Sequence, residues 1–163
     1  MDREILFRGK RLNNGEWVCG SLIQMDSEGS QSFIFPFYKY ASSLTCDQIV
    51  SMFMVAVDPA TVGQFTGLAD KNNKKIFKGD ITELTLENGE IRRFVVDIRT
   101  VTRTLVSHPD FDDETAKVQI TGVVFLWQGY ELFPCIDSNG ASDVSKMEVV
   151  GNTHDNPELL REE

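Results

Sequence analysis

The two histidines are the first residues whose chemistry is worth weighing, because both stand beside carboxylates. His108 is followed by Asp110, Asp112, Asp113 and Glu114, and His154 is followed by Asp155. A histidine held near carboxylates can bind a metal ion or transfer a proton. However, the acidic run lacks the glycine and the distal glutamate of an EF-hand calcium loop. The spacing therefore favours a solvated loop and a turn, and an enzyme site with an unrecognised carboxylate and histidine is an alternative.

A group of lysines is the second candidate, and it lies close to Phe77: Lys71, Lys74, Lys75 and Lys78. Lysines beside aromatic rings can hold single-stranded nucleic acid by charge and stacking. Lysines at a hairpin tip also keep it soluble and discourage pairing between strand edges. The second interpretation is favoured, and a nucleic-acid-binding module is kept as an alternative.

A run of aromatic residues is the third candidate, at Phe33, Phe35 and Phe37. Side chains alternate between the two faces of a strand, so these three share one face. Packing in the core explains this pattern most simply. A subunit interface is the main alternative, because aromatic residues are enriched in such surfaces.

Sequence motifs for catalysis or cofactor binding are not found elsewhere. The glycine-spaced segment 63–68 lacks the Gly-Lys-Ser/Thr ending of a phosphate loop, and there is no Gly-x-Ser-x-Gly nucleophile motif. Cys19, Cys46 and Cys135 are odd in number and widely spaced, which fits neither a disulfide framework nor a zinc site. We therefore expect no catalytic residue, no metal site and no cofactor.

The elements that would position these residues are short strands joined by tight turns. Asn14-Gly15 separates the strand-like residues 4–11 and 17–25, and Asn88-Gly89 separates 81–86 and 91–98. Both dipeptides supply the positive φ angles of a hairpin turn. Asp58-Pro59 and Asn156-Pro157 are each typical of the start of a short helix. The sequence thus predicts a mainly β chain whose antiparallel hairpins form a small barrel or a sandwich with one or two short helices.

Composition limits the classes of function. The 163 residues are 41% hydrophobic and carry a formal net charge of −9, all of it contributed by residues 83–163. An acidic half repels phosphate backbones, so general nucleic-acid binding is disfavoured. No apolar run approaches the roughly 20 residues of a membrane helix, and Met1-Asp2-Arg3-Glu4 shows no secretory signal. We expect a cytoplasmic protein with reduced cysteines and no membrane partner.

Three blocks of sequence resemble the YopX-type proteins of bacteriophages and prophages. The blocks are residues 4–18, residues 58–81 with Ile76-Phe77-Lys78-Gly79-Asp80-Ile81 at their end, and residues 148–160. The resemblance implies a single YopX-like domain over residues 1–163, with a possible subdivision near residues 55–60. It also implies a β-rich, SH3-like barrel part, assembly as a homo-oligomer and a bacterial host cytoplasm. It brings no catalytic or metal residues to carry over.

The sequence as a whole favours a protein that acts by binding, to itself and to a protein partner. The candidate interaction residues are Phe33, Phe35, Phe37, Lys71, Lys74 and Lys75. The alternatives are the nucleic-acid module and the enzyme described above.

Overall fold

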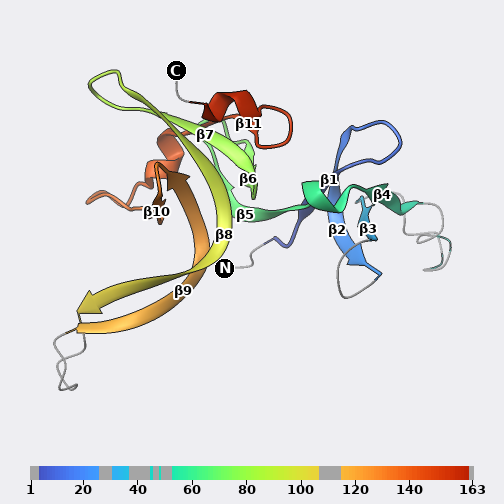
Figure 1. Ribbon diagram of the computed structural model, residues 1–163, viewed down its shortest axis with the longest axis horizontal. Coiled ribbons are helices and arrows are strands. Elements are labelled where there is room, and N and C mark those ends of the chain that lie inside the picture. Colours follow the sequence, from blue (N-terminus) through green and yellow to red (C-terminus); the bar gives the residue numbers. More distant parts are fainter. Residues whose placement is uncertain are drawn as a thin grey trace. The chain divides into compact units, whose positions relative to one another are not determined.

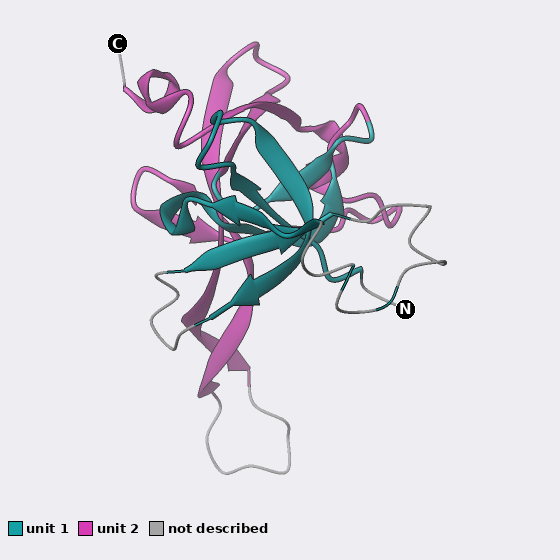
Figure 2. Cartoon of the chain, turned by 90° about the vertical axis from the view of Figure 1, so that its right-hand side faces the viewer, with its two compact units in different colours: residues 1–69, 73–79 teal, residues 70–72, 80–163 magenta. Residues whose placement is uncertain are grey.

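The computed structural model describes residues 4–25, 31–36, 45, 48, 53–106 and 115–161, which belong to two compact units (Figure 2). The first unit comprises residues 1–69 and 73–79, and the second comprises residues 70–72 and 80–163. The chain therefore passes between the units after residues 69, 72 and 79. The subdivision expected near residues 55–60 stays a prediction.

The first unit contains a six-stranded antiparallel sheet, which confirms the mainly β class for this part of the chain. Its order is β4-β3-β2-β1-β5-β6, so neighbouring strands are mostly hairpin partners (Figure 1). The strands are β1 (Phe7–Lys10), β2 (Trp17–Gln24), β3 (Ser32–Phe35), β4 (Val55–Val57), β5 (Gly63–Ala69) and β6 (Lys75–Phe77). The two edge strands, β4 and β6, have three residues each. Such short edge strands offer few backbone groups for pairing with a strand of another chain.

The second unit contains a five-stranded antiparallel sheet in the order β10-β9-β8-β7-β11. Its strands are β7 (Asp80–Thr85), β8 (Ile91–Val106), β9 (Thr115–Trp127), β10 (Tyr130–Leu132) and β11 (Glu148–Asn152). Among the described residues, an isolated antiparallel bridge joins Arg11, just after β1, to Val57 of β4, but no strand ladder closes either sheet into a barrel. The expected closed barrel is therefore not what these strands form, while a likeness to the SH3 fold or to a sandwich stays a prediction.

In the described part of the chain, three short turns of 3-10 helix accompany the sheets: η2 (Pro59–Thr61), η3 (Asp143–Lys146) and η4 (Pro157–Leu160). At η2, the Asp58 carboxylate accepts a hydrogen bond from the Ala60 N–H at 3.0 Å. Proline follows the capping position at η2 and at η4, where its missing N–H costs nothing. Only one turn forms at each place because the residues that follow lack a longer helical pattern.

The hairpin turns predicted at the two Asn-Gly dipeptides are confirmed. Gly15 and Gly89 have φ angles of 71° and 84°, and the strands on either side of each turn pair as β1–β2 and β7–β8. Gly79, just before β7, has a φ of 86°. Local turn chemistry thus fixes these reversals.

The core of the first unit is centred on Val18, Ile34 and Val57, which are 6%, 0% and 1% exposed. β2 and β3 approach each other closely beside this cluster. A Cβ at Gly20 would lie 2.0 Å from the Phe35 carbonyl oxygen, so only glycine fits at that point. Leu6, Phe65 and Phe77 form a second buried cluster.

The core of the second unit contains two aromatic rings, Phe94 of β8 and Phe125 of β9. Their centroids are 6.3 Å apart and their planes meet at 87°, which is a favourable edge-to-face arrangement. Val96, Val144 and Met147 are buried in the same unit. This core supports the inner ends of β8 and β9.

The outer parts of β8 and β9 continue beyond that core as a two-stranded ribbon (Figure 1). Ten residue pairs, from Asp97 opposite Val124 to Val106 opposite Thr115, make up this ribbon. Among the described residues, no third strand pairs with it, because β7 stops at Val95 and β10 at Phe125. We call residues 97–106 and 115–124 the arm.

Candidate binding site on the second unit

The tight turn between β9 and β10 places two aromatic rings together at the surface of the second unit. Gln128 and Gly129 have φ angles of 45° and 82°, as in the two-residue hairpin turns whose twist matches the strands. Trp127 and Tyr130 flank the turn and pair with each other. Their ring centroids lie 6.0 Å apart with an interplanar angle of 24°. A glutamine with positive φ is uncommon, so this turn holds a mildly strained backbone beside an aromatic stack.

One face of the sheet next to this turn mixes arginines with aliphatic side chains. On β8, Arg93, Val95 and Arg99 share a face because side chains alternate along a strand. Val95 is paired with Leu126 of β9, and Leu126 is paired in turn with Glu131 of β10. The register therefore collects residues that are far apart in the sequence.

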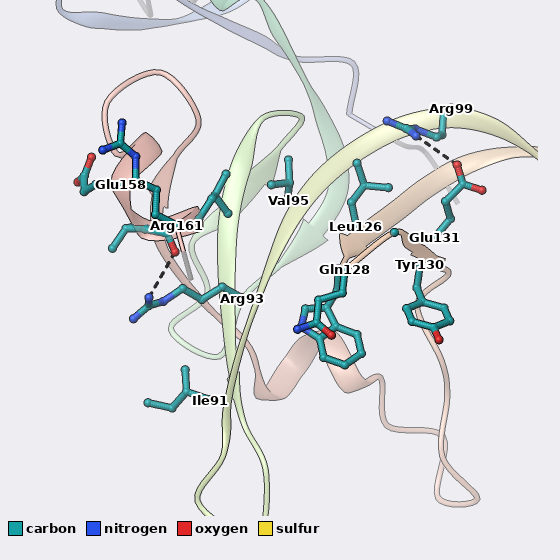
Figure 3. Close-up of a pocket in the computed structure, with 14 residues that line it drawn as sticks. Ile91, Arg93, Val95, Arg99, Leu126, Gln128, Tyr130, Glu131, Glu158 and Arg161 are labelled. Carbon is teal, nitrogen blue, oxygen red and sulfur yellow. Dashed lines mark hydrogen bonds and ion pairs between the residues drawn. The ribbon is translucent and has the colours of Figure 1, made fainter. Parts of the chain in front are cut away.

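These residues line an open groove with a volume of about 1470 Å³ (Figure 3). Its lining includes the aliphatic residues Ile91, Val95, Leu126, Leu159 and Leu160, and the aromatic residues Trp127 and Tyr130. Three of the seven basic residues between positions 83 and 163 also line it: Arg93, Arg99 and Arg161. Glu131 and Glu158 line it too, so the groove carries charges of both signs.

One wall of the groove is formed by η4 and is held by Arg93. Its guanidinium donates a hydrogen bond from Nη1 to the Leu159 carbonyl oxygen at 3.3 Å (Figure 3). The same group donates from Nε to the Glu83 carboxylate at 3.1 Å. Arg93 therefore anchors the C-terminal turn η4 to the sheet. Arg161, which follows η4, lies at the rim of the groove. Among the described residues, Arg161 has no ion-pair partner.

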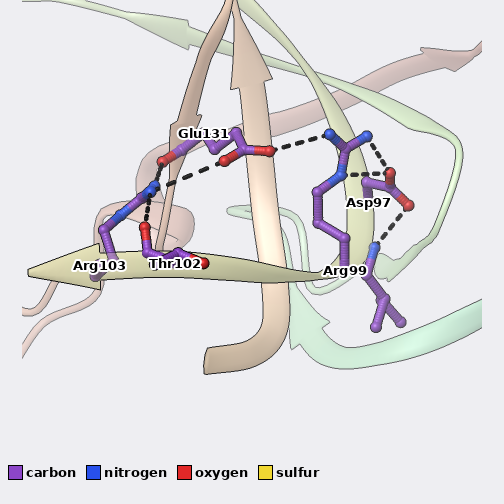
Figure 4. A network of polar contacts seen from close by, with 6 residues as sticks. Asp97, Arg99, Thr102, Arg103 and Glu131 are labelled. Carbon is purple, nitrogen blue, oxygen red and sulfur yellow. Dashed lines mark hydrogen bonds and ion pairs between the residues drawn. The ribbon is translucent and has the colours of Figure 1, made fainter. Parts of the chain in front are cut away.

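The opposite end of the groove is held by a network of two arginines and two carboxylates (Figure 4). Arg99 donates from Nε to Asp97 at 2.9 Å and from Nη1 to Glu131 at 3.2 Å. Arg103 contacts Glu131 twice, through its carboxylate at 3.8 Å and through its backbone carbonyl. The hydrogen bond to Asp97 and then that to Glu131 raise the pKa of the Arg99 guanidinium. The network ties β10 to the beginning of the arm.

The side chains that line the groove are aromatic, aliphatic and charged. Arginine, tryptophan and tyrosine are the residue types most enriched among the energetic centres of protein interfaces. Within the described part of the chain, no group of three or more His, Cys, Asp or Glu residues could hold a metal ion. The groove offers stacking, apolar contact and charge to a ligand.

The predicted aromatic face lies on β3 of the first unit. Phe33 is paired with Ile23 and Ala56, and Phe35 with Ser21; both rings are half-buried. Between them, Ile34 points to the opposite face and is fully buried in the core. Phe37 lies outside the described residues. An interaction role for Phe33 and Phe35 stays a prediction.

The predicted lysine group is divided between the two units. Lys71 belongs to the second unit, where its ammonium lies 2.6 Å from the Glu148 carboxylate. The hydrogen bond to Glu148 raises the pKa of Lys71. Lys75 belongs to the first unit, where it pairs with Glu4 and lies 5.1 Å from the Phe65 ring centroid. Lys74 and Lys78 are exposed residues of the first unit.

Of the two predicted histidines, the structure describes only His154. His108 is outside the described residues. His154 follows β11 in a turn, where its backbone N–H donates to the Asn152 side-chain oxygen at 3.0 Å. Asp155 also donates its N–H to that oxygen and accepts from the Asn152 amide, both at 2.9 Å. The turn predicted around His154 is confirmed.

The groove residues themselves were missed by sequence reasoning. Two signals pointed toward them: the alternation Arg93-x-Val95-x-Asp97-x-Arg99, and aromatic residues on both sides of Gln128-Gly129. Neither signal shows which strands become neighbours. The site depends on the pairing of Val95 with Leu126, a register that the sequence does not display.

A family model described as YopX protein matches residues 6–161, which is nearly the whole chain. No curated protein matches the chain. In the described residues, no helix is long and apolar enough to cross a membrane.

Proposed function

We propose that this chain, which belongs to the YopX protein family, acts by binding. The resemblance to that family brings no catalytic residues to carry over. The partners of the chain are a second copy of itself and another protein of the bacterial host or phage. The observation that carries this proposal is the arm, with which no third strand pairs among the described residues and at whose end Leu105 and Val106 are exposed. The groove described above adds a second surface suited to a protein ligand.

The two faces of the arm differ in chemistry. One face is polar, with Thr100, Thr102 and Thr104 of β8 opposite Thr121, Gln119 and Lys117 of β9. The other face is mostly apolar, with Val101, Arg103 and Leu105 opposite Ile120, Val118 and Ala116. On this face Leu105 is 48% exposed and Val101 is buried, while Val106, at the end of the polar face, is 87% exposed. Apolar side chains at the end of such a ribbon gain free energy when a partner covers them.

The backbone of the arm gives a second reason for self-association. An edge strand presents unpaired N–H and C=O groups that can accept another strand. Two-stranded ribbons are only marginally stable in water, and a third strand or a packed face stabilises them. An identical arm from a second copy supplies both an edge and an apolar face.

The test is the oligomeric state of the full chain in solution. Size-exclusion chromatography with light scattering should show a dimer or larger assembly at tens of micromolar protein. Leu105→Lys should weaken this association at least tenfold, because it places a charge on the apolar face of the arm. The matched control is Thr104→Lys, which adds the same charge to the polar face and should leave the association within about twofold. A clean monomer for the unmodified chain contradicts the proposal.

The nucleic-acid alternative is tested with the same preparations. Binding of single strands that falls with salt and is lost in the triple variant Lys71→Glu, Lys74→Glu, Lys75→Glu would favour it over protein binding. We expect no such binding, because residues 83–163 carry seven basic and sixteen acidic residues.

A further inference from the structure

A small apolar cavity lies in the second unit, on the face of the sheet that carries Phe94 and Phe125. We propose that it receives one benzene-sized ring, the side chain of a phenylalanine in the protein partner. This inference rests on the proposed binding of another protein and names one contact through which that binding occurs. The contact involves neither the arm nor a second copy of the chain.

The cavity has a volume of about 160 Å³ and is lined by residues of four strands and of the segment that follows β10. Leu84 of β7 is paired with Arg92 of β8, and Leu132 of β10 is paired with Phe125 of β9. Side chains two positions apart on a strand share a face, so Phe94 lies beside Arg92. The other lining residues are Leu86, Phe133, Asp143 and Met147.

Hydrogen bonds fix the segment 133–147, which forms one wall of the cavity. The Cys135 N–H donates to the Asp143 carboxylate at 3.1 Å, and the Asp143 N–H donates to the Cys135 carbonyl at 3.0 Å. Thr82 of β7 donates from its hydroxyl to the Met147 sulfur at 3.7 Å, and both residues are buried. The cavity is therefore formed before a ligand arrives, and a preformed site loses little conformational entropy on binding.

The size and the lining of the cavity select the class of ligand. A protein cavity of about 150 Å³ lined by Leu, Ile and Phe stays dry and binds benzene, whereas sites for drug-sized molecules have volumes of about 300–1,000 Å³. Seven of the nine lining residues are apolar. Three of them, Phe94, Phe125 and Met147, are buried. A single apolar ring therefore fits, and a nucleotide is too large and too polar.

The two charged residues of the lining have partners within the chain. Arg92 donates from Nε to the Glu90 carboxylate at 2.8 Å. Asp143 accepts from the Cys135 N–H, as described above. A charged ring would lose its hydration in this apolar cavity, which is unfavourable. The expected ring is therefore neutral.

The surface beside the cavity indicates a protein as the source of the ring. Leu132, which lines the cavity, is 41% exposed, and Tyr130, on the same face of β10, is 61% exposed. Tyr130 is stacked on Trp127, and the Arg92 guanidinium carbon lies 4.5 Å from the centroid of the Trp127 ring. Arginine, tryptophan and tyrosine are enriched among the energetic centres of protein interfaces. A peptide chain can cover these residues while its ring fills the cavity, whereas a free ring lacks such contacts.

Benzene is the probe for the cavity itself. The full chain, isotopically labelled at its methionine methyl groups, is titrated with benzene and followed by heteronuclear NMR. The Met147 signal should shift in a saturable way, and the signal of Met25, an exposed residue of the first unit, should stay in place. Benzoate, the same ring with a charge, should bind at least tenfold more weakly. Tighter binding of benzoate would show that the ligand is not a neutral ring.

Two variants that fill the cavity locate the binding of benzene. Leu132→Trp adds volume from the exposed side of the cavity, and Leu86→Phe adds volume beside β7. Each should weaken the binding of benzene at least tenfold. Leu12→Trp, at an exposed leucine of the first unit, is the matched control and should bind within about twofold of the unmodified chain. Circular dichroism shows whether each variant is folded. Unchanged binding in both folded cavity variants would show that benzene lies elsewhere.

A pair of blocked tripeptides tests the source of the ring. Acetyl-Gly-Phe-Gly-amide should compete with benzene, shift the Met147 signal and bind more tightly than benzene, because its backbone reaches the surface around Leu132. Acetyl-Gly-Ala-Gly-amide should not compete. If benzene binds and the phenylalanine peptide does not, a protein as the source of the ring is wrong.

The outcomes separate this contact from the proposed function. Neither titration depends on self-association. A chain that assembles in solution and binds neither benzene nor the phenylalanine peptide shows that the cavity contact is wrong while the proposed function stands. A clean monomer that binds both probes supports the cavity contact and shows that the proposed self-association is wrong.

Discussion

The inner and outer parts of the β8–β9 hairpin have the same backbone pairing and different surroundings. In the inner part, β7 and β10 lie beside the hairpin, and Phe94, Val96 and Phe125 are 4%, 1% and 2% exposed. In the arm, Val101 and Val124 are still buried, whereas Thr100, Thr102 and residues 104–106 are exposed, and among the described residues no third strand pairs with it. The antiparallel register continues through both parts without interruption. We therefore expect the burial of side chains, rather than the number of ladder hydrogen bonds, to set the stability of each part.

The largest expected effect comes from removing an aromatic ring of the inner part. Phe125→Ala should lower the free energy of unfolding by about 3–5 kcal/mol, because it leaves a cavity beside Phe94. Thr104→Ala in the arm should cost less than about 1 kcal/mol, which is the span of strand propensity. Urea denaturation of the two variants measures both values. Equal losses would show that the arm is as tightly packed as the core.

Hydrogen exchange should separate the two parts of one strand. At a protein concentration where the chain is monomeric, amides of β8 between residues 92 and 96 should exchange only through extensive unfolding. Amides of the arm should exchange through local opening at a far smaller free energy, from about zero to a few kcal/mol. Mass spectrometry of peptides from each part measures the difference. Protection of the arm that rises with concentration would link it to self-association, and uniform protection in the monomer would contradict the comparison.

The network at the junction of the two parts should contribute little to stability. Arg99→Met keeps the side-chain stem and removes the contacts with Asp97 and Glu131. Because the side chain of Arg99 is 39% exposed, solvent screens these pairs, and the loss should be about 0–1 kcal/mol. A double-mutant cycle with Glu131→Gln measures the coupling. A value well above that range would mean that the network, and not the core, holds β10 to the arm.

The smallest expected effect concerns the turn between β7 and β8, which precedes the inner part of β8. Hydrogen bonds from Arg92 and then from Asn88 lower the pKa of Glu90. A carboxyl whose pKa is lower in the folded state stabilises that state above its unfolded pKa, and the contribution disappears as the pH falls through the folded pKa. The melting temperature of Glu90→Gln should therefore lie slightly below that of the unmodified chain at neutral pH. The difference should vanish in acid, and a difference that stays constant with pH would contradict this origin.

The sequence predicted the local reversals well and the groove not at all. Asn14-Gly15 and Asn88-Gly89 identify hairpins because the required φ angles are a property of those residues alone. The groove depends on Val95 meeting Leu126 and on Leu126 meeting Glu131. Such a register is decided by the packing of the whole sheet, so no single segment reveals it.

Lys71 illustrates the same limit for charged residues. In the sequence it stands with Lys74 and Lys75 as part of one basic group. In the structure it belongs to the second unit, since the backbone N–H of Lys71 donates to the Met147 carbonyl at 2.8 Å. Its side chain pairs with Glu148. Contacts with residues more than seventy positions further along the sequence thus decide which unit Lys71 joins.

The three-residue excursion at positions 70–72 has a consequence for how the protein is made and cut. A ribosome that has released 79 residues has delivered the whole of the first unit and also a fragment of the second. The Asp70 carboxylate, 5% exposed in the finished chain, accepts from the Val149 N–H at 2.9 Å, and Val149 is still untranslated at that moment. A gene split after residue 79 yields a second piece in which that buried N–H has lost this acceptor. No single cut in the gene can therefore yield both units intact.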